Sequence, residues 1–174
     1  MATFRFVEVR LMEVLSAWIP TTPEMEVKLL FGPHVWDCAQ AADALGKRTH
    51  ELRLPLQHSM TPSPAYLRVL DELAAAQGAA RRLTALYDAI LPALGQRYRR
   101  YLEQTDALMD APTARIVECI LDTQGRMLRE ARELREQMPA LGPDDPLWLR
   151  KLIDADAAVG ELVVEDDDDA RQAA

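Results

Sequence analysis

The stretch "LFGPHVWDCAQAADALGKRTH", residues 30–50, carries the pattern that decides the fold. At the helical spacing of about 100° per residue, its apolar side chains gather on one side, with His34 among them. The residues that lie within about 40° of His34 on such a wheel are Val27, Leu30, Cys38, Ala41 and Leu45. The pattern predicts one long amphipathic helix whose buried stripe has a histidine at its centre.

The rest of the chain repeats this helical periodicity. Glycine is scarce, with 7 in 174 residues, and strong helix formers dominate the composition. The helices predicted are 4–18, 22–53 with Thr22 as N-cap, 64–77, 79–109, 112–138 and a short one at 147–152. Gly78 leaves open whether 64–109 is one helix or two, and we expect Pro33 and Pro92 to bend their helices.

The long helices and short connections predict an all-α, four-helix-bundle fold, with antiparallel up-down long helices and short extra helices. Residues 1–155 form the single domain in this interpretation. The segment 156–174, which contains the acidic run "VVEDDDD", is expected to be a disordered tail.

Composition argues against several partners and locations. The net charge is −8 and the basic clusters are short, which is unlike a nucleic-acid-binding surface. No apolar run approaches 18 residues, so we expect no membrane span, and the first residues lack the pattern of a secretory signal. Cys38 and Cys119 have no metal-binding or redox spacing, which favours two reduced, buried thiols in a cytoplasmic protein.

His34 and Asp37 are the candidate metal ligands. A histidine at the centre of a core stripe, beside an acid and a proline, is what a metal site in a bundle core would use. The alternative is a core histidine whose ring nitrogens are satisfied by Asp37, Tyr98 or Tyr101. Cys38 lies one turn from His34, but burial makes such a thiol inert.

The other predicted helices offer few charged ligands to the core. Tyr98, Tyr101 and Gln124 are the inward polar candidates, which could line a cofactor or ligand site but fit core packing better. Glu8 is placed on the flank of its helix, and Glu-x-x-His spacing is absent. No catalytic residue is assigned, and no cofactor is expected; iron or manganese would be the metal if one binds.

The stretches "FRFVEVRLMEVLSAWIPTTPEMEVKLLFGPHVWDCAQAADALGKRTHELR", residues 4–53, and "DAPTARIVECILDTQGRMLREARELR", residues 110–135, resemble helices of uncharacterised bacterial ferritin-like proteins. The resemblance implies a four-helix bundle, which in active members holds two metal ions. Gln124 and Met127 stand where that family places Glu-x-x-His, so the resemblance implies a bundle that has lost its dinuclear site.

Three functions follow as hypotheses. The first is a structural or interaction subunit, either a homodimer or the partner of an enzyme, in which exposed aromatics such as Trp36 and Phe31 make the contact. The second is a divergent iron- or manganese-dependent oxidase or hydroxylase that uses His34 and Asp37. The third is a small-molecule-binding bundle whose tyrosines and His34 line a pocket.

Overall fold

The computed structural model describes residues 1–106, 108–143, 145–160 and 162, and every regular element in these ranges is helical. The elements are α1 (Ala2–Thr21), α2 (Met25–Glu51), α3 (Pro64–Ala74), α4 (Ala79–Leu83), the π-helix η1 (Thr84–Ile90), α5 (Leu91–Gln104), α6 (Ala111–Gln137), the 3-10 turn η2 (Pro139–Leu141) and α7 (Pro146–Ala157). The all-α prediction is confirmed.

The turn between α1 and α2 is fixed by a buried arginine. Thr22, predicted as the N-cap of the second helix, instead donates its hydroxyl to the Trp18 carbonyl at 2.8 Å. The same hydroxyl oxygen accepts from Arg82 at 2.7 Å, and Arg82 also reaches the Trp18 and Ala76 carbonyls. The cap prediction was wrong because this buried cation recruits the hydroxyl as an acceptor.

Helix α2 is continuous through Gly32 and Pro33. Both residues are exposed, so the proline ring faces away from the core and displaces no packed neighbour. Phe31, predicted off the main stripe, is fully buried and packs against Trp18 with ring centroids 5.6 Å apart. The buried stripe of α2 is therefore rotated toward Phe31 relative to the prediction.

The segment 64–109 contains more than one helix. Ser63 caps α3 by accepting from the backbone N–H of Tyr66 at 3.3 Å. Gly78 then separates α3 from α4, because its φ of +79° is not helical. This left-handed conformation favours glycine. The question left open by the sequence is settled by that residue.

A π-helix joins α4 to α5 and makes them one rod. Pro92 lies in the first turn of α5 and has no N–H to donate to the preceding turn. The wider turns of η1 immediately before it absorb this break, where the sequence predicted a bend. The same stretch turns Tyr87 into the core, where it is 3% exposed.

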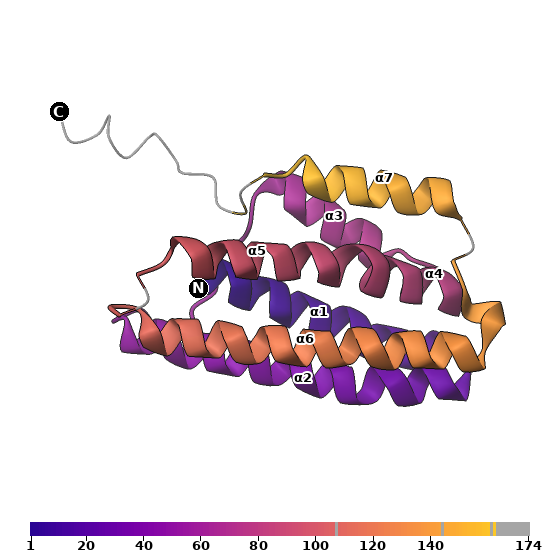
Figure 1. Ribbon diagram of the computed structural model, residues 1–174, viewed down its shortest axis with the longest axis horizontal. Helices are drawn as coiled ribbons and strands as arrows, with labels where there is room; N and C mark the ends of the chain where they lie inside the picture. Colours follow the sequence, from indigo (N-terminus) through magenta and orange to yellow (C-terminus); the bar gives the residue numbers. More distant parts are fainter. Residues whose placement is uncertain (107, 144, 161, 163–174) are drawn as a thin grey trace.

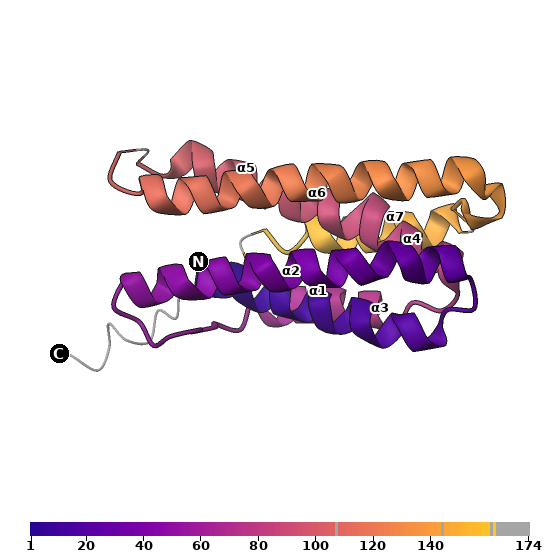
Figure 2. The same ribbon diagram turned by 90° about the horizontal axis from the view of Figure 1, so that it is seen from below.

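The long helices surround one core (Figure 1). Helix α1 packs along α2, α2 along α6, and α6 along α5, while α3 and α7 lie together on the far side of the rod. Seen from below, α5 and α6 form one side and α1 and α2 the other (Figure 2). Because the connection through α3 runs back along the molecule, α2 and the α4–α5 rod run in the same direction, so the order is not simply up-down.

The boundary predicted at residue 155 falls inside α7, which continues to Ala157. Asp156 is 4% exposed and pairs with Arg97 at 2.7 Å, and the carbonyl of Leu162 accepts from the N–H of Ser63. Most of the predicted tail, including the acidic run, lies outside the described residues. Within the described part of the chain, no helix combines the length and the apolar character that crossing a bilayer requires.

Candidate functional site

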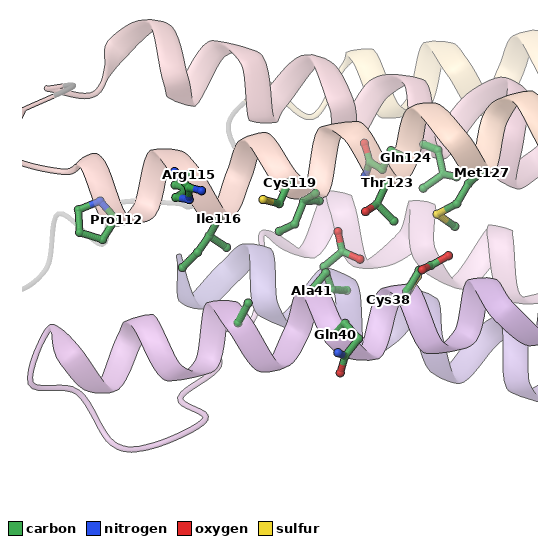
Figure 3. Close-up of a pocket in the computed structure, with 15 residues that line it drawn as sticks. Cys38, Gln40, Ala41, Pro112, Arg115, Ile116, Cys119, Thr123, Gln124 and Met127 are labelled. Carbon is green, nitrogen blue, oxygen red and sulfur yellow. The ribbon is translucent and has the colours of Figure 1, made fainter.

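A pocket of about 470 Å³ lies between α2 and α6 (Figure 3). Most of its wall comes from these two helices, with one residue each from α1 and α5. The lining residues are Glu8, Asp37, Cys38, Gln40, Ala41, Ala44, Leu91, Pro112, Arg115, Ile116, Cys119, Ile120, Thr123, Gln124 and Met127. Nine of these fifteen residues have apolar or thiol side chains, and the other six, which include the cation Arg115, are polar or charged. Apolar walls that carry polar groups are usual in ligand sites. We call it the α2–α6 pocket.

Glu8 brings a carboxyl group to this apolar wall. Its side chain is 3% exposed, and its Oε1 accepts from the Tyr98 hydroxyl at 2.6 Å. Burial raises the pKa of Glu8 to about 7, although hydrogen bonds from Tyr98 and Cys38 oppose the shift. The prediction that Glu8 lies on the flank of its helix was wrong, because α1 turns this residue toward α2 and α5.

Gln124 is the second buried polar group of the α2–α6 pocket. It is 5% exposed, and its Nε2 finds no hydrogen-bond partner among the described residues. Its Oε1 lies 3.2 Å from where a Cβ on Gly95 would be, so the absence of a side chain there makes room for the amide. A buried amide without a partner is costly, on the order of 1–3 kcal/mol, unless another group hydrogen-bonds to it.

His34 lies in the core with both ring nitrogens occupied. Nε2 donates to the Glu130 carboxylate at 2.8 Å, and Nδ1 accepts from the Tyr87 hydroxyl at 2.6 Å. Burial lowers the pKa of His34 despite the Glu130 carboxylate, so a neutral imidazole fits this arrangement. The partners are neither of the tyrosines that the sequence suggested, nor Asp37.

Asp37 faces a cation instead of His34. Arg126 holds both carboxylate oxygens of Asp37 at 2.7 Å and also contacts Glu130 at 3.0 Å. In the described residues no group of three or more His, Cys, Asp and Glu side chains is arranged to hold a metal ion. A guanidinium at this position also disfavours a second cation. The metal role of His34 and Asp37 therefore stays a prediction without support from this geometry.

Tyr98 and Tyr101, the two tyrosines predicted on the inner face, make hydrogen bonds in different parts of the molecule. Tyr98 is fully buried, and its hydroxyl donates to the Glu8 carboxyl group, which lines the α2–α6 pocket. Tyr101 is half-buried and donates to Asp110, which also accepts from Arg48 at 3.1 Å. Tyr101 thus ties the end of α5 to the start of α6, away from the pocket wall.

Cys119 gives the α2–α6 pocket an accessible thiol. The prediction of two buried thiols holds for Cys38 but was wrong for Cys119, which is exposed. Figure 3 shows Cys119 on α6 across from Ala41 of α2. Burial raises the pKa of the Cys38 thiol well above its ordinary value, so only Cys119 is set to react with thiol reagents.

The chain matches no family model, no curated protein and no solved structure.

Proposed function

We propose that the chain is a small-molecule-binding protein, and that the α2–α6 pocket is its binding site. One observation carries the proposal: an apolar pocket of about 470 Å³ includes a Gln124 amide whose Nε2 is buried without a partner. A bound molecule with an apolar body would remove the apolar wall from water, and its polar group would hydrogen-bond to the amide.

The arrangement of the helices supports a ferritin-like bundle as the scaffold. The chain makes a single long return connection, through α3, between α2 and the α4–α5 rod. One long crossover is the connectivity of ferritin-like bundles, and ligand sites in bundles lie between facing helices. The membership itself, like the bacterial source and the cytoplasmic location, is part of the proposal.

The experiment uses Cys119 as a reporter of occupancy. We expect 1-octanol to slow the reaction of the exposed Cys119 thiol with a thiol-specific reagent such as DTNB, because the octanol body occupies the pocket that Cys119 lines. Cys119→Ser should abolish the fast reaction. Unchanged kinetics up to the solubility limit of octanol would refute the proposal.

A filling variant separates pocket binding from surface binding. Ala41→Trp places an indole into the pocket wall and should remove the protection by octanol. Ala17→Trp adds the same side chain to an exposed position on α1 and should leave the protection intact. Equal protection in both variants would place the octanol elsewhere.

Self-association is the second proposal, and an exposed row on α2 favours it. Met25, Leu29 and Trp36 are 60%, 68% and 64% exposed, and they share one helix face with Gly32. A Cβ on Gly32 would meet nothing within 4 Å, so the backbone there is open to close approach. A second copy packed antiparallel about Gly32 would set Trp36 of each copy against Leu29 of the other.

Sedimentation equilibrium tests this second proposal. The natural chain should be a dimer, and Trp36→Glu should be a monomer. Leu147→Glu is the matched control, because Leu147 is 78% exposed on α7, and it should leave the dimer intact. A natural chain that is monomeric at all concentrations would contradict the proposal.

A further inference from the structure

The α2–α6 pocket contains a carboxyl group that lacks a cation. Glu8 receives hydrogen bonds from the neutral Tyr98 hydroxyl and the Cys38 thiol, and no ion pair to Glu8 is found in the described part of the chain. The other acid of the wall, Asp37, is neutralised by the bidentate contact with Arg126. The unpaired acid of this wall is therefore Glu8.

We propose that the natural occupant is an organic amine with an apolar body, whose ammonium group pairs with the Glu8 carboxylate. The inference rests on the proposed function, because it names the class of molecule that the same pocket takes. An ammonium group would supply the countercharge that Glu8 lacks, and charge-assisted hydrogen bonds of this kind are stronger than neutral ones. A buried carboxylate with two donors but no cation is the geometry that such a ligand completes.

Gln124 provides a second contact for the head group. No hydrogen bond of its amide is found in the described part of the chain, although the residue is buried. The amide oxygen can accept from an ammonium N–H, and the amide nitrogen can donate to a hydroxyl or carbonyl next to the amine. The apolar body would then lie along Ala41, Ile116 and Met127.

The ionisation of Glu8 fits this assignment. With a pKa of about 7, the carboxyl group is protonated in the empty pocket at low pH and is easily converted to the carboxylate near neutrality. The groups that surround it from α5, α3 and α2 are Tyr98, Tyr66 and Cys38, whose pKa values burial raises, and Asp37, which is held by Arg126. From α6 the pocket wall adds the exposed side chains of Cys119 and Arg115, and Arg115 makes no ion pair with Glu8 in the described part of the chain. Amine binding should therefore strengthen from pH 5 to pH 8.

The test compares three probes with the same eight-carbon body: n-octylamine, 1-octanol and octanoate. In isothermal titration calorimetry at pH 8, the natural chain should bind octylamine about tenfold or more tightly than octanol, since a charge-assisted contact contributes on the order of that factor. Octanoate should bind weakest, because its charge repels the Glu8 carboxylate.

Two variants assign the preference to one carboxyl group. Glu8→Gln should reduce the octylamine-to-octanol ratio to near unity. Glu13→Gln, the same substitution at an exposed position of α1, should retain the ratio. If Glu8→Gln does not fold, the natural chain alone still tests the amine assignment. Its preference for octylamine over octanol must then be smaller at pH 5 than at pH 8, because Glu8 is protonated at pH 5.

The outcomes separate the two proposals. Equal binding of octylamine and octanol, or a preference for octanoate, would overturn the amine assignment and leave the pocket as a binding site for another class. An amine preference that survives in Glu8→Gln would also overturn it. Binding of none of the three probes would overturn both proposals.

Discussion

The substitution Glu8→Gln should change how the stability of the fold depends on pH. The pKa of Glu8 is raised from its ordinary value of 4.5 to about 7 in the folded chain, mainly by burial. Because the folded protein holds this proton more tightly than the unfolded chain, unfolding releases a proton between these values. The stability of the natural chain should therefore fall as the pH rises through this window.

The magnitude follows from the size of the shift. A change from 4.5 to about 7 corresponds to about 3 kcal/mol. Between pH 5 and pH 8 the natural chain should lose about 2–3 kcal/mol relative to Glu8→Gln, whose amide stays neutral and can still accept from the Tyr98 hydroxyl.

Urea unfolding followed by circular dichroism at pH 5, 6, 7 and 8 measures this difference. Titration of other groups cancels in the comparison of the two proteins, and Glu13→Gln controls for the loss of one surface charge. A difference between Glu8→Gln and the natural chain that does not change with pH would refute the account of the buried carboxyl group.

The remaining predictions concern the Tyr87–His34 hydrogen bond, two glycines and the removal of metal ions. Tyr87→Phe removes the donor to Nδ1 of His34 and should lower the free energy of unfolding by about 1–2 kcal/mol, measured by urea unfolding; an unchanged value would contradict the hydrogen bond. Gly78→Ala should lower it by about 1 kcal/mol because φ is +79°, whereas Gly125→Ala, inside α6, should raise it by about 0.5–1 kcal/mol. EDTA should leave the melting temperature unchanged, since the nitrogens of His34 are occupied by protein groups, and a clear fall would revive a metal site.

The helical class was predictable because it rests on local signals. The period of the apolar residues, Ser63 before a proline and Gly78 between two periodic stretches each act over a few residues. The π-helix was not predictable, since the sequence signals only that Pro92 must disturb a helix, and tertiary packing decides how.

The site was only partly predictable. Gln124 and Tyr98 were placed on inner faces by their spacing, and both are buried at the core. Glu8 was missed because a helical wheel shows one helix in isolation. It cannot show that α2 and α5 both pack against α1 and so bury residues on the flank of its apolar stripe. Glu130 was missed because its partner is His34, 96 residues away in sequence, although the Arg126 one turn before it was a signal of an ion pair.

The α2–α6 pocket is proposed to take up a small molecule. The most direct test is a titration of the 15N-labelled chain with 1-octanol, followed by two-dimensional 1H–15N NMR. If the pocket binds octanol, the shifted amides should cluster in residues 37–44 and 112–127, and Ala41→Trp should abolish the shifts. Shifts that gather on α3 and α7 instead, or the absence of any shift, would contradict the proposal.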